Sequence, residues 1–413
     1  MKIYLVGGAV RDSLLNLPIK DKDWVVVGAT IEMLLKNNFQ QVGKGFPVFL
    51  HPVSHEEYAL ARTEYKLGHG YYGFKTNFSP EVTLEDDLMR RDLTINAIAQ
   101  TNSGKLIDPY CGQVDLKNRI LRHVSPSFVD DPLRVLRVAR FAATFSYLGF
   151  SIATETLLIM KSIVKSKELL YLKSERIWKE TEKAFVSNHP HVYFQILHAC
   201  NALILLFPEI NRLFNIDSTF YYFYNMWNKN IHLLKYLAYV SKKTKEIDVR
   251  LACLFQLLKI KSNFITNVNI DQEKQDYYCY LFLQNFFVRF NIPIYIRDLS
   301  ILIIKYHNFI NNIFYAKSYD IVIFLGKIDA WRKPKRIKKI ELLSNLYYKL
   351  FQFQYNKSVL PGKFLSIAYS ITSTVTAKFI LHLGFKGIEI SKELVRLRSM
   401  RLDMYRKNIV YYR

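Results

Sequence analysis

The hydrophobic pattern of this chain changes once, near Pro132, and that change constrains the fold more than any other feature. Before Pro132, short apolar runs alternate with turns rich in glycine, proline and asparagine, which is typical of strands in a small sheet. The runs that predict strands are 2–6, 23–27, 46–50 and 57–62. Helices are expected over 9–15 and 30–37, and the segment 105–124 returns to short strand and turn.

After Pro132, apolar residues recur at helical spacing almost to the end of the chain. The clearest helical segments are 133–146, 153–164, 175–186 and 191–206, followed by aromatic-rich helical sequence over 218–330 and a basic joint at 331–339. The fold is therefore predicted to be α+β, with a small mixed head and a long helical body. The glycine- and aromatic-rich stretch 65–79 has no clear period and is predicted to be a mobile loop.

The excess of basic charge lies in the helical part. The 413 residues carry a formal net charge of +23. Residues 1–130 hold 15 basic and 15 acidic side chains, whereas residues 300–413 hold 21 basic and 6 acidic ones. A neutral head with a basic body suggests chemistry in the first and polyanion binding in the second. A generally basic composition would give the same balance, and charge does not separate nucleic acid from an anionic membrane surface.

Targeting signals and cysteines indicate a cytoplasmic protein. No run of 18 or more apolar residues occurs, so no membrane span is expected. The first residues, MKIYLVGGAVRD, lack the apolar region and cleavage site of a signal peptide. The four cysteines form no Cys-X-X-Cys pair, which is typical of reduced thiols.

Gly7 and Gly8 separate the first predicted strand from a helix that carries Arg11. Paired glycines at such a turn let the backbone approach a ligand, and the free N–H groups at the helix N-terminus suit a phosphate. Arg11 would reach a second phosphate oxygen. A tight strand-to-helix turn explains the two glycines equally well, so this motif alone leaves both interpretations open.

Asp21 and Asp23 stand directly before the apolar strand 24–27. Residues two apart in an extended segment point to the same side. Two carboxylates arranged in this way can bind Mg²⁺, which activates an attacking hydroxyl and neutralises a leaving pyrophosphate. A lone Asp-X-Asp is usually a solvated turn, but its position after a Gly-Gly turn and ahead of a buried strand favours the metal site.

Two arginine-rich motifs follow. In Asp87-Leu-Met-Arg90-Arg91-Asp92, the arginines either belong to a solvated helix start or pair with the flanking aspartates and leave one guanidinium for a triphosphate. Asp131 precedes Pro132 and is a natural helix N-cap. Beyond it, three arginines at steps of three lie on one side of an otherwise apolar helix, at 134, 137 and 140. Such cations are unfavourable in a core unless anions meet them.

In this order, the motifs resemble those of the bacterial tRNA nucleotidyltransferases, the class II CCA-adding enzymes of the polymerase-β-like superfamily. The matching segments are LVGGAVRD (5–12), DKD (21–23), RRDLTINAIA ending at Ala99, IDPY (107–110) and DDPLRVLRVARF (130–141). The match covers about residues 1–210 and returns at IDAWRKP (328–334) and GFKGIEI (384–390). Residues 215–325 resemble the family in length and helical character.

The resemblance implies a mixed-sheet nucleotidyltransferase head followed by an elongated helical body. It also implies template-independent addition and repair of the 3′-terminal CCA of tRNA from CTP and ATP, by two-metal in-line attack of the tRNA 3′-hydroxyl that releases pyrophosphate. tRNA is then the partner, and no obligatory protein partner is expected. The implied parts are a catalytic head (1–125), a neck that recognises the base (126–215), a helical body (216–330) and a basic tail that binds tRNA (331–413).

The resemblance also implies roles for single residues. Asp21 and Asp23 are the catalytic ligands of Mg²⁺, and Glu57 is a candidate third carboxylate. The nucleotide is contacted by Gly8 and Arg11, its triphosphate by Arg91, Arg137 and Arg140, and its base by Asp131 and Arg134. A carboxylate accepts hydrogen bonds and a guanidinium donates them. Such a pair accepts cytosine and adenine, which offer an amino group beside an acceptor, and rejects uracil and guanine.

One departure from the family concerns the helical body. Relatives often carry a metal-dependent phosphohydrolase module marked by a His-Asp pair, and Gln256-Leu257 stands where that pair is expected. His232 corresponds to an upstream metal ligand, but one histidine cannot hold the metal centre. The sequence therefore predicts no phosphatase or phosphodiesterase activity.

Two other functions fit part of the pattern. Bacterial poly(A) polymerases share the head motifs, although they usually have longer N-terminal and C-terminal extensions. A catalytically inactive tRNA-binding protein would keep the basic body, but the complete set of carboxylates and arginines argues against it. The stretch 65–79 is a candidate moving part in the change from C to A addition.

Overall fold

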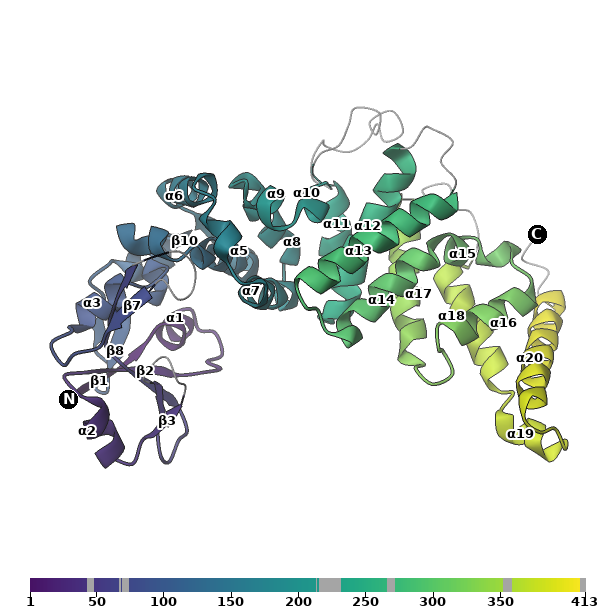
Figure 1. Ribbon diagram of the computed structural model, residues 1–413, viewed down its shortest axis with the longest axis horizontal. Helices are drawn as coiled ribbons and strands as arrows, with labels where there is room; N and C mark the ends of the chain where they lie inside the picture. The colour runs from purple at the N-terminus through teal and green to yellow at the C-terminus, as the bar shows by residue number, and fades with distance from the viewer. Residues whose placement is uncertain are drawn as a thin grey trace. The chain divides into compact units, whose positions relative to one another are not determined.

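The computed structural model describes residues 1–42, 48–66, 68, 74–212, 214, 232–265, 272–351 and 359–408. The chain divides into two compact units, Met1–Asn211 and Arg212–Arg413 (Figure 1). Each unit has its own core, so each is described by itself. The predicted boundaries at 125, 215 and 330 stay predictions.

The first unit is built on a mixed seven-stranded sheet with the order β3-β4-β5-β2-β1-β8-β9. The strands are β1 (Lys2–Val6), β2 (Asp23–Val27), β3 (Gln40–Val42), β4 (Val48–Leu50), β5 (Glu57–Leu60), β8 (Ala99–Thr101) and β9 (Leu106–Ile107). β2 and β5 are parallel, and the other neighbours are antiparallel. The register sets Asp23 opposite Val6 on one side and opposite Glu57 on the other.

Both faces of the sheet are covered. The head helices are α1 (Gly8–Leu14), α2 (Ile31–Lys36), α3 (Leu84–Met89) and α4 (Gly112–Asn118). Val25 belongs to a core cluster with Leu84 and Leu88 of α3, whereas Val26 belongs to a second cluster with Leu34 of α2. Successive strand residues point to opposite faces. The unbroken apolar run of β2 therefore reflects a strand that is buried on both sides.

Two head segments differ from the sequence-based expectation. The predicted loop 65–79 overlaps two strands, β6 (Thr63–Lys66) and β7 (Phe74–Asn77), which pair with each other in antiparallel fashion. Both ends of the predicted loop are therefore β-strand. The glycines proposed to move, apart from Gly68, lie outside the described residues. The segment 105–124 was expected to be strand and turn but contains α4, because the Asp108 carboxylate accepts hydrogen bonds from the N–H groups of Gly112 and Gln113 (2.7 and 2.8 Å). Asp108 lies four residues before the helix, so the spacing of apolar residues does not reveal this contact.

Apart from the short strand β11 (Ser151–Ile152), which pairs with β10 (Ile120–Leu121), the rest of the first unit is helical, as predicted. Its helices are α5 (Leu133–Phe145), α6 (Thr154–Lys165), α7 (Ser174–Val186), α8 (Pro190–Ala199), α9 (Ala202–Leu206) and α10 (Pro208–Asn211). α5 is largely buried and packs against α7 and α8. The single helix expected over 191–206 is two helices, because Asn201 adopts a left-handed conformation (φ 62°) between them.

The second unit is all-helical within its described residues. Its longer helices are α11 (His232–Ser241), α12 (Ile247–Ile265), α13 (Gln272–Arg289), α14 (Ile294–Lys305), α16 (Ser318–Lys327), α17 (Lys335–Phe351), α18 (Pro361–Ser373) and α20 (Ile388–Asn408), with the shorter α15 (His307–Asn311) and α19 (Ala377–His382) between them. α12 packs on α14, α17 on α18, and α16 on α20. The mixed head and helical body confirm the predicted fold class.

One stretch of the second unit, Pro361–His382, is long and apolar enough to cross a membrane by length and composition. It is two helices, α18 and α19, with 13 and 6 residues. A membrane-spanning helix needs about 20 residues. α18 buries Phe364, Leu365 and Ala368 against its neighbours. In all, 33% of the apolar window is buried within the unit, and neither helix alone has the length of a span.

A cluster of Tyr, Gln, His and Asn side chains occupies the interior of the second unit. It includes Gln256, which stands where relatives often have a His-Asp pair. Gln256 is 3% exposed, and its Oε1 accepts a hydrogen bond from the Tyr236 hydroxyl (2.8 Å). Its Nε2 lies 3.4 Å from His307 Nδ1, and His307 Nε2 lies 3.0 Å from Asn311 Nδ2. His232 begins α11, but its side chain lies outside the described residues. The expectation that this protein has no phosphatase or phosphodiesterase activity stays a prediction.

Candidate active site

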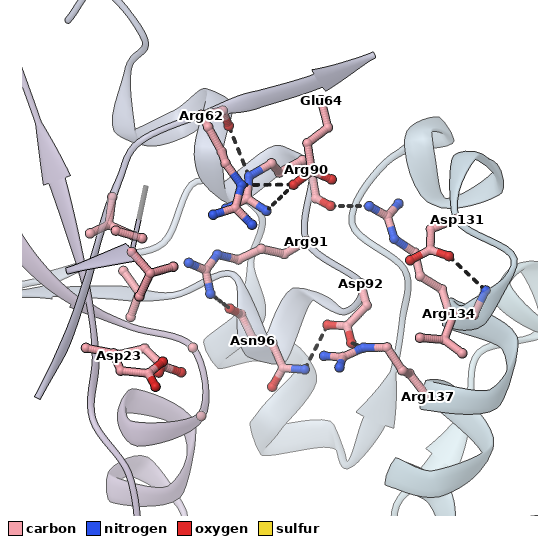
Figure 2. A pocket seen from close by; sticks show the side chains of 18 of the residues that line it. Asp23, Arg62, Glu64, Arg90, Arg91, Asp92, Asn96, Asp131, Arg134 and Arg137 are labelled. Atoms are coloured by element: carbon pink, nitrogen blue, oxygen red, sulfur yellow. Dashed lines mark hydrogen bonds and ion pairs between the residues drawn. The ribbon is translucent and has the colours of Figure 1, made fainter. Parts of the chain in front are cut away.

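A cleft of about 860 Å³ in the first unit is lined from both the sheet and the helical part (Figure 2). Its arginines are Arg11, Arg62, Arg90, Arg91, Arg134, Arg137, Arg140 and Arg176, and its acids are Asp23, Glu57, Glu64, Asp92 and Asp131. The cations outnumber the anions, so the cleft is suited to a polyphosphate. It contains every predicted site residue except Asp21.

Gly7, Gly8 and Arg11 form one side of the cleft, at the β1–α1 turn. Gly7 has a left-handed backbone (φ 70°), and a Cβ there would lie 2.9 Å from Arg91 Nη1. The positive φ of the turn therefore requires glycine here, and the nearby Arg91 guanidinium adds a contact that a flexible side chain could relieve. Arg11 is 8% exposed and donates from Nη1 to Asn96 Oδ1 (2.6 Å) and from Nε to Asp12 (2.9 Å). Burial lowers the pKa of Arg11, while Asp12 raises it.

Asp23 is the first residue of β2 and lines the cleft, beside Glu57 on β5. Asp21 lies two residues earlier in an exposed segment. Desolvation raises the pKa of Asp23, Arg91 lowers it, and the charge of Asp21 raises it further. Within the described residues, none of these three carboxylates makes a hydrogen bond or ion pair.

The two adjacent arginines of the third motif share one buried carboxylate. Asp87 is fully buried and accepts hydrogen bonds from Arg90 Nη2 (2.5 Å) and Arg91 Nη2 (3.1 Å). Arg90 also bonds Glu64 (3.2 Å). Burial alone would raise the pKa of Asp87, but the two arginines outweigh it and lower the pKa. The solvated-helix interpretation of this motif is wrong, and Arg91 Nε remains buried without a partner in the structure.

A chain of hydrogen bonds connects the head to α5, as Figure 2 shows, and ion pairs to Glu180 continue it to α7. Asn96 donates from Nδ2 to Asp92 (2.9 Å), and Asp92 accepts from Arg137 Nε (2.6 Å). On the other side, Glu180 accepts from Arg140 Nε (2.5 Å) and lies 3.8 Å from Arg137 Nη1. Burial alone would raise the pKa of Asp92, but Arg137 and Asn96 hold it far below its usual value. These anions meet the cations that the sequence left unexplained on α5.

Asp131 and Arg134 lie at the start of α5. Asp131 Oδ1 accepts from the Leu133 N–H (3.1 Å), so Asp131 caps the helix as predicted, and its Oδ2 accepts from Arg176 Nη2 (3.0 Å). Arg134 is 8% exposed and donates from Nη1 to the Ser127 carbonyl (2.6 Å) and from Nη2 to the Arg90 carbonyl. Both side chains line the cleft with fixed orientations.

Sequence analysis missed three supporting residues, Asn96, Glu180 and Arg176. Asn96 stands within the matching segment that ends at Ala99, but no role was assigned to it. Glu180 lies 40 residues beyond Arg140, so no local pattern joins them. The signal available was a charge balance: three arginines on an apolar helix require anions. Asp92 was recognised as a flanking acid, but its partner is Arg137 rather than Arg90 or Arg91.

Known protein families match both parts of the first unit. Residues 3–122 match the poly(A) polymerase head domain, and residues 149–214 match a probable RNA- and SrmB-binding site of polymerase A. Among curated proteins, a CCA-adding enzyme of Buchnera aphidicola subsp. Acyrthosiphon pisum (strain Tuc7) is 52% identical, with 99% of each chain covered. A CCA-adding enzyme of Buchnera aphidicola subsp. Baizongia pistaciae is 48% identical, covering 100% of this chain and 99% of the other.

Solved structures agree in fold. A CCA-adding enzyme in complex with ATP has a TM-score of 0.61 at 20% identity, covering 97% of this chain and 86% of that one. The complex of a CCA-adding enzyme with CTP has a TM-score of 0.59 at 19% identity, covering 97% and 87%. The identities to the curated relatives confirm the family resemblance seen in the sequence. This chain belongs to the bacterial CCA-adding enzymes, the class II nucleotidyltransferases with a poly(A) polymerase head.

Proposed function

We propose that the cleft adds and repairs the 3′-terminal CCA of tRNA from CTP and ATP. One observation carries this assignment to the site. Among the cleft acids of the described chain, Glu64, Asp92 and Asp131 each bind an arginine, whereas Asp23 and Glu57 bind none. Two carboxylates that stay without a partner beside so many guanidinium groups are available for a divalent cation.

Asp21 and Asp23 fit Mg²⁺, the hard cation that prefers oxygen ligands. Mg²⁺ is usually held by one or two carboxylates together with substrate phosphates. Such an ion lowers the pKa of an attacking hydroxyl and neutralises the leaving pyrophosphate. No three His, Cys, Asp or Glu side chains in the described part of the chain are arranged to hold one metal ion. Glu57 is therefore proposed as a neighbour that supports the pair.

The arginines are proposed to hold the triphosphate. Arg11 and Arg91 flank the Gly7-Gly8 turn, whose backbone would approach the phosphates. Arg137 and Arg140 use Nε toward Asp92 and Glu180. A guanidinium has five N–H donors, so this arrangement orients each side chain and leaves other N–H groups for phosphate oxygens. A fixed cationic field of this kind stabilises charge that develops on the leaving group.

The base is proposed to be read by Asp131 and Arg134. Arg176 and the Leu133 N–H hold the carboxylate, and two carbonyls hold the guanidinium. Each carboxylate oxygen keeps lone-pair capacity for an amino group of cytosine or adenine. A uracil or guanine carbonyl would face the carboxylate without a hydrogen bond. Sites built for hydrogen bonds reject such analogues by about 10⁴-fold.

The tRNA is proposed to bind along the helical parts through its backbone. Residues 331–413 are proposed as a basic tail for tRNA, and 126–215 as the neck that reads the base. Phosphate contacts of this kind give salt-sensitive affinity. A cytoplasmic location is proposed on the same basis, since the substrate is tRNA.

The test is incubation of the purified protein with tRNA lacking CCA, together with CTP, ATP and Mg²⁺. A product extended by C, C and A that then stops supports the proposal. A long A-tail would instead indicate a poly(A) polymerase. The double change Asp21→Ala, Asp23→Ala serves as the control, with tRNA binding measured in parallel to exclude loss of the fold.

A further inference from the structure

We propose that Glu56 is a positioning residue that holds the Asp21–Asp23 segment ready for a divalent cation. The inference rests on the proposed function of the two aspartates. Glu56 lies outside the cleft lining and outside every motif of the sequence analysis. Its position is nevertheless set by the same strands that carry Asp23.

The two faces of the sheet separate Asp23 from Glu56. Asp23 is opposite Glu57 in the parallel register, and Trp24 is opposite Tyr58. Residues opposite each other point to the same face, and successive residues point to opposite faces. Asp23 and Glu57 therefore lie on one face of the sheet. The Trp24 and Tyr58 side chains lie on the other face, with Val26 and Leu34 of the second core cluster, although both residues also line part of the cleft. Glu56, two residues before Tyr58, belongs to the same face as Tyr58.

The carboxylate of Glu56 bridges the two residues that flank Asp23. Trp24 Nε1 donates to Glu56 Oε2 (2.8 Å), and Lys22 Nζ lies 3.3 Å from Glu56 Oε1. One side chain thus binds both the residue before Asp23 and the residue after it. Because Lys22 also stands between the aspartates, this bridge constrains the whole Asp-Lys-Asp segment from behind.

The bridge is anchored on a fixed base. The Trp24 ring stacks on Tyr58 with centroids 5.6 Å apart, and Tyr58 is 8% exposed. The backbone of Glu56 is held in the β4–β5 turn, where its carbonyl accepts from the His51 N–H (3.0 Å). Glu56 therefore links the β4–β5 turn and the stacked Trp24 ring to Lys22, in the exposed segment that leads into β2.

The bridge has a second consequence for charge. The Lys22 side chain is 46% exposed and is sequence neighbour to two carboxylates. Without Glu56, its ammonium would be free to pair with Asp21 or Asp23 and compete with a divalent cation. Glu56 draws that ammonium to the other face. Removing Lys22 should accordingly relieve part of the defect caused by removing Glu56.

The test measures Mn²⁺ binding to the full-length protein without tRNA or nucleotide, by the electron paramagnetic resonance signal of free Mn²⁺. The isosteric change Glu56→Gln should weaken Mn²⁺ binding about tenfold, the lower end of the effect of outer partners on metal sites. The double variant Glu56→Gln, Lys22→Met should recover part of this loss. Glu81→Gln, an exposed acid of the same head, is the matched control and should bind as the wild type does.

The outcomes distinguish a failure of the proposed Glu56 role from a failure of the proposed metal site at Asp21 and Asp23. If Asp21→Ala, Asp23→Ala binds Mn²⁺ as the wild type does, the proposed metal site itself fails. If that variant loses Mn²⁺ while Glu56→Gln binds normally, the positioning role alone is overturned. Should Glu56→Gln lose its thermal transition, Trp24→Phe repeats the test, because it keeps the ring and removes the N–H. Weaker binding by Trp24→Phe supports the bridge, and unchanged binding rejects it.

Discussion

Two buried polar clusters, one in each unit of this protein, are built in opposite ways. In the first unit, Asp87, Asp92 and Glu180 are buried as charges, and each is held by arginines. In the second unit, Gln256 and His307 are buried beside one another, with Tyr236 completing a cluster that contains no carboxylate. Both arrangements satisfy polar atoms in a core, as folding requires.

The two clusters differ in whether carboxylates without a protein partner lie near them. In the first unit the paired acids keep the guanidinium groups oriented, while Asp21 and Asp23 stay without partners in the described structure. In the second unit the amide, ring and hydroxyl groups hydrogen-bond one another, and Gln256 carries no charge to attract a cation. Metal-dependent chemistry is therefore proposed for the first unit, and the following experiments test that contrast.

The largest effect is expected from the aspartates themselves. Replacing Asp21 and Asp23 by alanine should reduce nucleotide addition by at least about 10³-fold, because metal stabilisation of the transition state is worth several kcal/mol. Binding of tRNA, measured by filter retention, should stay within about twofold. Residual addition near the wild-type rate would contradict the assignment, and loss of tRNA binding would mean that the residues are structural.

A stability effect is expected from Asp92, which lies in the network of the first unit. Asp92→Asn should destabilise that unit by about 2 kcal/mol, because it removes a charge-assisted hydrogen bond from Arg137, whose side chain is 35% exposed and still lies near Glu180. Urea unfolding measures this change. The isosteric change Asp403→Asn, at an exposed acid of α20, is the control and should leave the unfolding midpoint unchanged.

The same network predicts a pH dependence. The folded state holds the pKa of Asp92 below its unfolded value of about 3.9. The stabilisation is thus fully present above that unfolded pKa and is lost as the pH falls toward the folded pKa. The stability difference between wild type and Asp92→Asn should therefore shrink on acidification below about pH 4. A difference that stays constant down to pH 2 would contradict the ion pair as its cause.

Base selection should depend on the carboxylate of Asp131. Asp131→Ala removes the acceptor for the amino group, so discrimination of CTP against UTP should fall by about 10²-fold. The measurement is kcat/KM for each nucleotide on tRNA lacking CCA. Glu85→Ala, an exposed acid on α3, is the matched control. Equal losses with CTP and UTP would indicate a role in holding the helix start instead.

The sequence predicted the residues of this site better than it predicted their partners. Asp23, Arg11 and Arg134 were expected in one site because each stands in a short motif with a fixed order, and they line one cleft. The link from Arg140 to Glu180 was not predictable, since it joins residues on α5 and α7 that only packing brings together. Asp21 was expected beside Asp23, but it does not line the cleft.

The prediction of secondary structure from the sequence was wrong where side-chain contacts, rather than apolar spacing, determine the element. α4 begins at a cap from Asp108, and a Cβ on Gly112 would collide with the Thr94 carbonyl, so a tertiary contact selects this glycine. Helices such as α5 were predicted because burial on one side imposes a regular spacing. The mixed order of the sheet depends on long-range pairing, for which a single strand carries no signal.

The smallest effect is expected from the Tyr236–Gln256–His307 cluster of the second unit. Tyr236→Phe removes a hydroxyl whose oxygen lies 2.8 Å from Gln256 Oε1 and 2.7 Å from the Leu343 carbonyl, and whose single proton serves one of these two acceptors. A buried acceptor left without its donor costs about 1–3 kcal/mol, so the unfolding midpoint should fall while CCA addition below that midpoint is unchanged. Mn²⁺ binding should also be unchanged, since the cluster is assigned no cation. Loss of Mn²⁺ binding in Tyr236→Phe would show a second metal site in the helical unit and end the contrast drawn between the two units.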